Sequence, residues 1–173
     1  MGTKENWSQA SWDADRGLEV VDGIMSFISD GRGQPSKNQR ALYVAVIAFG
    51  YALWENYVED LCIELVKQMA PVIEPSRLPA PLVERINQGL TPWQLAVDPG
   101  WRTEWVTRTT IAAKGDGHKR HGMSMARAEA VNDLFVWVGI LPFTGMAPSM
   151  KKVDDLVELR NSVVHTGKIP DSL

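Results

Sequence analysis

A long helical pattern that ends at a proline constrains the fold of this chain more than any other feature. From about Asn38 to Ala70, apolar residues recur every three or four positions. Pro71 stops the segment, because proline cannot continue a helix. No segment alternates apolar and polar residues convincingly, as a half-buried strand would. The sequence therefore predicts an all-α chain built around this helix.

Shorter helices are predicted on both sides of the long one. Their expected ranges are about Trp12–Ser29, Leu82–Gln88, Trp93–Val97, Ser124–Val138 and Ser149–Thr166. Residues 101–114 are ambiguous, because their β-branched Val and Thr side chains weaken the helical prediction. Gly139 is expected to cap the helix before it. The predicted fold is a helical bundle with two long core helices and short accessory helices.

Length and composition fit one domain in a reducing compartment. The 173 residues suffice for a single core, so residues 1–173 are expected to form one domain with a flexible segment at 1–11. Cys62 is the only cysteine and lies on an apolar helix face, which predicts a buried, inert thiol. The apolar run 41–54 is too short to span a bilayer, and no signal peptide is apparent. A cytoplasmic protein without membrane contact is expected.

Two charged residues interrupt otherwise apolar helix faces. On a helical wheel, Arg160 falls in the middle of an apolar stripe, and Asn161 and His165 stack at its edge. Glu55 falls on the apolar face of the long helix. Because an unpaired buried guanidinium is costly, we expect Glu55 to pair with Arg160. Such a pair can also be purely structural.

The string 160-RNSVVH-165 resembles the R-N-x-x-x-H motif of HEPN domains. The helix around 47-IAFGYALWENYVEDL-61 is similar to the first core helix of that family. The resemblance covers roughly Asn38–Ala70 and Ser124–Gly167, and residues 71–122 match nothing. HEPN domains are helical bundles, and many are metal-independent ribonucleases of toxin–antitoxin and phage-defence systems.

The resemblance implies an endoribonuclease that needs no metal or cofactor. His165 would move protons, Arg160 would hold the phosphate, Asn161 would orient the backbone or imidazole, and Glu55 would fix the guanidinium. Arg160 and His165 diverge by about 140° on one helix. The resemblance resolves this through a homodimer whose motifs share one cleft. RNA, either tRNA or mRNA, would be cut to 2′,3′-cyclic phosphate ends.

The loop 114-KGDGHKRHG-122 is a second candidate site. A net charge of −3 gives no overall attraction for RNA, so binding requires a local basic patch. This exposed loop offers such a patch in Lys114, His118, Lys119, Arg120 and His121. An ordinary solvated loop is an equal alternative, and a metal site at the two histidines is a poorer one.

Other functions stay open at this stage. A non-catalytic HEPN-like scaffold in a defence or signalling complex would need the same bundle. An antitoxin-type or immunity-type module that blocks a partner enzyme would also need it. The complete Arg–Asn–His string favours the enzyme, because a scaffold has no evident need for His165. A cognate antitoxin or another defence protein is an expected partner.

Overall fold

The computed structural model describes residues 8–28, 35–78, 82–84, 97, 100–118 and 121–167. All regular elements in these ranges are helical, which confirms the all-α prediction. The α-helices are α1 (Gln9–Met25), α2 (Lys37–Met69), α5 (Trp101–Lys114), α6 (Ala128–Phe135) and α7 (Ala147–Thr166). Short 3₁₀ helices are η2 (Pro75–Arg77) and η3 (Val136–Val138).

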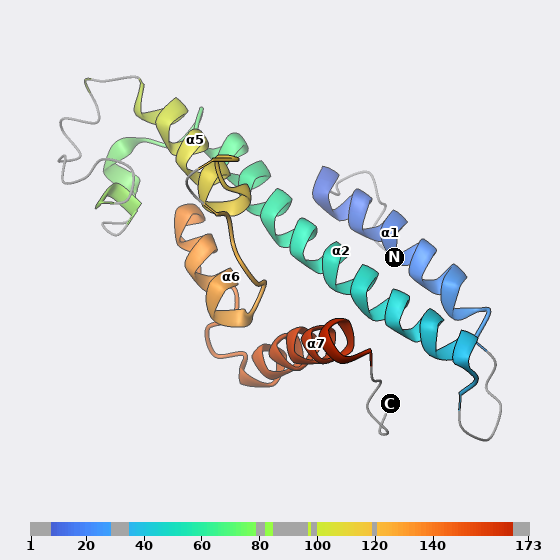
Figure 1. Cartoon of the computed structure of the whole chain (residues 1–173). Helices are drawn as coiled ribbons and strands as arrows, with labels where there is room; N and C mark the ends of the chain where they lie inside the picture. The colour runs from blue at the N-terminus through green and yellow to red at the C-terminus, as the bar shows by residue number, and fades with distance from the viewer. Residues whose placement is uncertain are drawn as a thin grey trace.

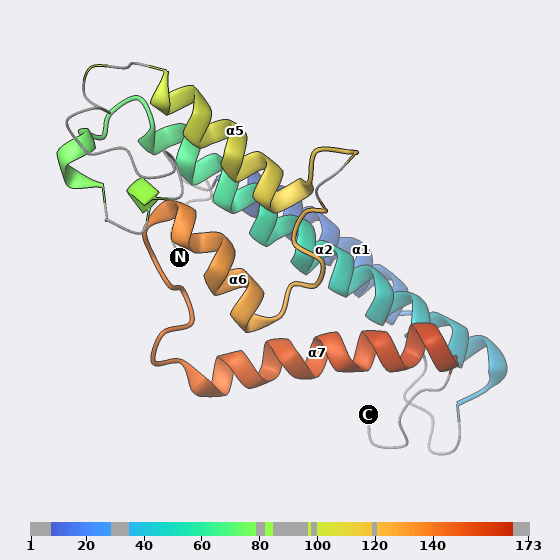
Figure 2. The ribbon, with the colours of Figure 1, turned by 60° about the vertical axis from the view of Figure 1, so that its left-hand side comes forward.

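Helix α2 is the spine on which the other helices pack (Figure 1). Helix α1 runs antiparallel along it, and α5 lies against its C-terminal half (Figures 1 and 2). Helix α7 approaches the N-terminal half of α2 with its own C-terminal end, and α6 lies between α5 and α7 (Figure 2). The segment 160-RNSVVH-165 thereby lies beside the part of α2 that contains Tyr51.

Side chains from one helix cap the ends of others. The Glu64 carboxylate on α2 accepts hydrogen bonds from the backbone N–H groups of Gln9 (3.3 Å) and Ala10 (3.1 Å) at the start of α1. Asp154 on α7 accepts a 3.0 Å bond from the N–H of Ala128, the first residue of α6. Free N–H groups at a helix start need such acceptors, so these contacts fix how the helices pack.

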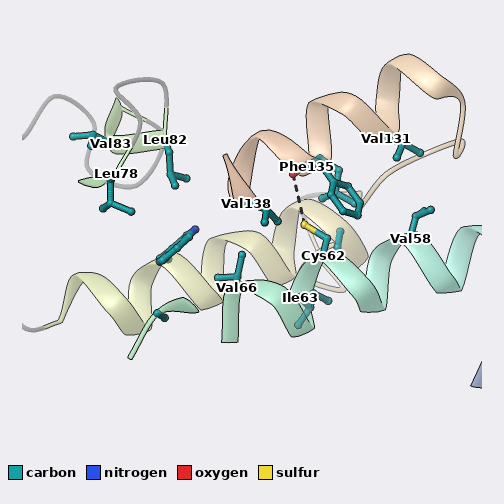
Figure 3. Close-up of a cluster of buried hydrophobic side chains, with 14 of the residues drawn as sticks. Val58, Cys62, Ile63, Val66, Leu78, Leu82, Val83, Val131, Phe135 and Val138 are labelled. Atoms are coloured by element: carbon teal, nitrogen blue, oxygen red, sulfur yellow. Dashed lines mark hydrogen bonds between the residues drawn. The ribbon is translucent and has the colours of Figure 1, made fainter. Parts of the chain in front are cut away.

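The core lies along the C-terminal half of α2 (Figure 3). Val58, Cys62 and Val66 of α2 face the apolar side chains of α6 there. The Cys62 thiol is fully buried and donates a 3.6 Å hydrogen bond to the carbonyl of Leu134. Burial raises the pKa of this thiol to about 12, so it stays protonated. The predicted burial of Cys62 is confirmed.

The N-terminal half of α2 is less completely buried than its C-terminal half. In the described part of the chain α2 is the helix whose length and composition would allow it to cross a membrane. Core helices of soluble proteins reach the same length and apolar composition. Only 17% of the 18-residue apolar window of α2 is buried. Most apolar side chains of this window are half-buried, and Phe49 is the large one that is exposed, at 37%.

Several predicted boundaries need correction. Helix α1 begins at Gln9 and ends at Met25, where Trp12 and about Ser29 were expected, so residues 9–11 belong to a helix rather than to a flexible segment. Residues 101–114, ambiguous in sequence, are helical, and Gly139 is the expected left-handed cap with φ 80°. Of the predicted helices Leu82–Gln88 and Trp93–Val97, only residues 82–84 and 97 are described, and these are helical.

Candidate functional site

The Arg160 guanidinium lies over the ring of Tyr51, where α7 meets α2. Its central carbon is 5.1 Å from the ring centroid, within the range of a cation–π contact. One terminal nitrogen, Nη1, donates a 2.9 Å hydrogen bond to Oδ1 of Asn161. The half-buried Arg160 is therefore held by an aromatic face and a neutral amide.

The Tyr51 hydroxyl both donates and accepts a hydrogen bond. The ring is 4% exposed, and the hydroxyl donates a 3.0 Å hydrogen bond to Oε1 of Glu55. The same oxygen accepts a 3.0 Å bond from the backbone N–H of Ala126. Burial, together with the Glu55 carboxylate, raises the pKa of Tyr51, although the bond from Ala126 opposes the shift. The phenol therefore stays neutral and acts as a donor to Glu55.

The expected ion pair between Glu55 and Arg160 is not formed. Ion pairs in the described ranges join other residues, and both Glu55 and Arg160 contact Tyr51 instead. Glu55 lies one turn after Tyr51 on α2, so its carboxylate reaches the hydroxyl of its own helix first. The aromatic ring and the Asn161 amide, rather than a carboxylate, offset the partial burial of Arg160.

Asn161 connects the motif to the loop before α6. Its Nδ2 donates a 3.7 Å hydrogen bond to the sulfur of Met125, and its Oδ1 accepts from Arg160. Both ends of the amide are used, so Asn161 is oriented toward the arginine rather than toward the imidazole of His165. Asn161 thus orients the guanidinium of Arg160, whereas it was expected to orient the backbone or the imidazole of His165.

His165 is exposed in the last turn of α7, which ends at Gly167 with φ 64°. It lies five residues after Arg160, which places the two side chains about 140° apart around the helix. Val163, about 60° from Arg160 and about 160° from His165 around the helix, is buried and faces the bundle. A single chain therefore does not direct Arg160 and His165 toward one point.

Lys114 is not part of an open basic patch. Its Nζ lies 2.8 Å from Oδ1 of Asp60 and 3.6 Å from Oε2 of Glu59, so α5 is tied to α2 at this point. Burial alone would lower the pKa of Lys114, but the hydrogen bond and charge of Asp60, followed by Glu59, raise it overall. Two acidic residues of α2 therefore offset the charge that Lys114 was expected to offer to RNA.

The two histidines of the predicted loop are exposed. The backbone N–H of His118 donates a 2.9 Å bond to Oδ1 of Asp116, and His121 faces solvent. Lys119 and Arg120 lie outside the described residues. Within the described ranges, His, Cys, Asp and Glu side chains form no group of three that could hold a metal ion.

Sequence reasoning missed the central role of Tyr51 and the contribution of Met125. Tyr51 lies on the same helix face as Glu55 and one turn before it, a spacing at which a phenol and a carboxylate can bond. That spacing was the available signal. Met125 carries no comparable signal, because its contact with Asn161 joins residues 36 positions apart.

A separate groove of about 620 Å³ lies between α1 and α2. It is mainly apolar, and its lining residues are Ser8, Ser11, Ala14, Asp15, Leu18, Gly50, Leu53, Trp54 and Tyr57. Tyr51, Glu55, Arg160, Asn161 and His165 do not line it. The groove and the arginine site are therefore distinct places on the molecule.

Comparison with protein-family models, with curated protein sequences and with solved structures finds no match to this chain.

Proposed function

We propose that this chain is a metal-independent endoribonuclease of the HEPN type that acts as a homodimer. The observation that carries the proposal is the state of Arg160. Only neutral groups, the Tyr51 ring and the Asn161 amide, hold its guanidinium in the described structure. An arginine that is oriented but not neutralised keeps its charge available for a phosphate.

Cleavage of RNA without a metal requires charge stabilisation at the phosphate. The ribose 2′-oxygen attacks the adjacent phosphorus, the 2′-hydroxyl proton passes to a base, and the bond to the 5′-oxygen breaks. The leaving 5′-oxygen takes up a proton, and the products carry a 2′,3′-cyclic phosphate and a 5′-hydroxyl. In this scheme Arg160 binds the non-bridging oxygens and stabilises the charge that develops on them.

Proton transfer is assigned to His165. An imidazole can take up and release protons near neutral pH, and the exposed position of His165 leaves it accessible to a substrate. Because Arg160 and His165 diverge on α7, one chain does not supply both groups to one phosphate. Two copies around a two-fold axis would bring two motifs to a shared cleft.

The N-terminal half of α2 supports the homodimer. Most side chains in its apolar window are half-buried rather than fully buried, and Phe49 is 37% exposed, so apolar surface remains that association could bury. A second copy would cover it and place the two α7 ends near each other. We further propose a cytoplasmic toxin or phage-defence effector that acts on tRNA or mRNA and is controlled by a cognate antitoxin or another defence protein.

The test is cleavage of end-labelled tRNA and of a generic RNA in excess EDTA. Wild type is expected to cut and leave cyclic phosphate ends, and His165→Ala and Arg160→Ala are each expected to slow cleavage at least about 100-fold. Lys152→Ala, which removes an exposed charge of α7 outside the motif and outside the loop, is the control and should retain the wild-type rate. Loss of wild-type cleavage in EDTA, or equal rates for wild type and His165→Ala, would refute the proposal.

A non-catalytic binding module is the second candidate, either a scaffold or an antitoxin-type or immunity-type protein. It is favoured by the exposed apolar surface of α2 and by the pairing of Lys114 with Asp60, which removes a cation from the predicted RNA patch. Expression in a heterologous host without a cognate antitoxin, and purification from the native host, separate the candidates. In the heterologous host a ribonuclease toxin should arrest growth unless His165 is replaced. A binding module should be harmless there and should purify from the native host in a stable heteromeric complex.

A further inference from the structure

We infer that Tyr51 is the positioning residue of the arginine site, and that Glu55 acts on Arg160 through the Tyr51 hydroxyl. This inference rests on the proposed ribonuclease for its effect on activity, although its structural part does not. It reassigns Glu55 from a direct partner of the guanidinium to a group that fixes an aromatic platform. The same platform connects α2, α7 and the loop before α6.

The platform begins with the ring of Tyr51. The Arg160 carbon lies 5.1 Å from its centroid, and the ring is 4% exposed, so neighbouring groups keep it in place. An arginine side chain has several freely rotating bonds and must lose that freedom to hold a phosphate in one geometry. Stacking on a fixed ring supplies this restriction before the substrate binds.

The hydroxyl fixes the ring because it is bonded in two directions. It donates to Glu55 at 3.0 Å and accepts from the backbone N–H of Ala126 at 3.0 Å. Glu55 belongs to the same helix as Tyr51, whereas Ala126 lies 75 residues further along the chain. The ring is thus fastened both to its own helix and to the loop before α6.

The loop before α6 also connects to Arg160 through Asn161. Met125 precedes Ala126, and its sulfur accepts a hydrogen bond from Asn161, whose Oδ1 accepts from Arg160. Arg160 is therefore reached by two routes, one through the Tyr51 ring and one through Asn161. Both routes meet in the Met125–Ala126 segment, so its position sets the position of the guanidinium.

Three substitutions test the Tyr51 ring, the Tyr51 hydroxyl and the Glu55 charge one at a time. Tyr51→Phe keeps the ring and removes both hydrogen bonds, and Tyr51→Leu removes the ring. Glu55→Gln keeps an acceptor oxygen for the hydroxyl but removes the negative charge. A direct Glu55–Arg160 ion pair would make Glu55→Gln damaging, whereas an action through the hydroxyl makes it mild.

The structural readout is the side-chain NMR signal of Arg160, assigned by its loss in Arg160→Lys. Protons held over an aromatic ring resonate at shifted positions, so wild type, Tyr51→Phe and Glu55→Gln should all show a ring-induced shift. Tyr51→Leu should lose it. An unchanged Arg160 signal in a folded Tyr51→Leu variant would overturn the inference.

The activity readout uses Tyr51→Phe and Glu55→Gln, together with Glu55→Ala, in the EDTA cleavage assay. Tyr51→Phe should lower kcat about tenfold with little change in KM, and Glu55→Gln should stay within about threefold of wild type. Glu55→Ala should lower kcat as Tyr51→Phe does. In the double variant Tyr51→Phe/Glu55→Ala, kcat should be no lower than in Tyr51→Phe alone. The hydroxyl through which Glu55 acts is already absent from Tyr51→Phe.

These outcomes distinguish the two proposals. If wild type does not cleave RNA but the Arg160 signal depends on the Tyr51 ring, the ribonuclease fails and the positioning role stands. If wild type cleaves and the losses of Tyr51→Phe and Glu55→Ala multiply, the coupling through the hydroxyl fails. Tyr51→Phe and Glu55→Ala decide the matter even if Tyr51→Leu does not fold.

Discussion

The indole nitrogen of Trp54 donates a 2.9 Å hydrogen bond to the backbone carbonyl of Ala126. Ala126 is fully buried, and its N–H bonds to the Tyr51 hydroxyl, three residues before Trp54 on α2. Both polar backbone groups of a buried loop residue are thus satisfied by side chains of one helix. This arrangement meets the requirement that buried N–H and C=O groups be paired, and it holds the loop beside the arginine site.

Replacing Trp54 by phenylalanine should leave the Ala126 carbonyl buried and unpaired. We expect Trp54→Phe to lower the free energy of unfolding by about 2 kcal/mol. The measurement is urea unfolding followed by far-UV circular dichroism. Tyr57→Phe, on the same helix, is the control and should change stability by less than about 0.5 kcal/mol. Equal stability of Trp54→Phe and wild type would show that this bond does not hold the loop.

Gly122 should tolerate no side chain, because it packs against the C-terminal backbone of α5. A Cβ there would overlap the carbonyl oxygen of Ala113 and lie 2.6 Å from the carbonyl carbon of Lys114. Backbone atoms cannot rotate away, so Gly122→Ala should cost about 2–3 kcal/mol of unfolding free energy.

Gly23→Ala provides the matched control for that substitution. Gly23 lies in α1, where an added Cβ meets nothing within 4 Å. Alanine there should stabilise the protein by about 0.5–1 kcal/mol, because glycine is unfavourable within a helix. Chemical unfolding of both variants tests the pair, and a loss for Gly23→Ala or a gain for Gly122→Ala would contradict these assignments.

The sequence predicted the local features of the fold well. Helical periodicity and Pro71 located α2 to within a residue at each end, since α2 runs over Lys37–Met69. The sequence predicted that the helix corresponding to α6 would begin near Ser124, whereas α6 begins at Ala128. Ala126 does not join the helix because its backbone groups bond to Tyr51 and Trp54. Contacts across more than 70 residues leave no local trace in a sequence.

The sequence predicted the candidate site only in part, because it does not show which distant residues make contact. The apolar stripes indicated that Glu55 and Arg160 lie where α2 and α7 meet, and both contact Tyr51 there. A helical wheel gives the direction of a side chain but not which neighbour it bonds. It therefore suggested an ion pair where the structure has a phenol between the two charges. The ion pair of Lys114 with Asp60 was not predicted either, because the approach of Asp60 depends on how α5 packs on α2.

Lys114→Ala should produce a small, salt-sensitive loss of stability. Lys114 bridges α5 to Asp60 and Glu59, but it is partly exposed, so we expect a loss of at most about 1 kcal/mol. Added salt should shrink the difference from wild type, because salt screens partly exposed charges. Unfolding at low and high ionic strength measures the effect. A loss that does not depend on salt would argue against the electrostatic assignment.

Glu59 should make stability fall as the pH rises above the ordinary glutamate pKa of 4.5. Burial raises the pKa of Glu59 in the folded protein, even though the charge of Lys114 opposes the shift. Between 4.5 and the raised pKa the folded state holds more protons than the unfolded state, so unfolding becomes easier with increasing pH. The stabilising contribution of protonated Glu59 is complete below 4.5 and is lost above the raised value.

Glu59→Gln isolates this effect. The variant should gain stability relative to wild type as the pH rises from 4.5 towards the raised pKa of Glu59, because glutamine has no proton to lose. Lys114 keeps its partner Asp60 at 2.8 Å in the variant, so the helix contact remains. Unfolding free energies at matched pH values give the comparison. A difference that is constant over this range would mean that the raised pKa is wrong.

Phe49→Asp should separate the proposed homodimer. Phe49 is 37% exposed on the poorly covered half of α2, where a second copy would bury it. A carboxylate there would have to be desolvated on association, so we expect dimerisation at least tenfold weaker and RNA cleavage lowered in parallel. Val72→Asp is the control, because Val72 is 79% exposed just beyond the C-terminal end of α2, roughly 30 Å from Phe49 along the helix. Sedimentation velocity and the EDTA cleavage assay measure both effects. A wild-type chain that sediments as a monomer but still cuts RNA would separate the chemistry from the homodimer.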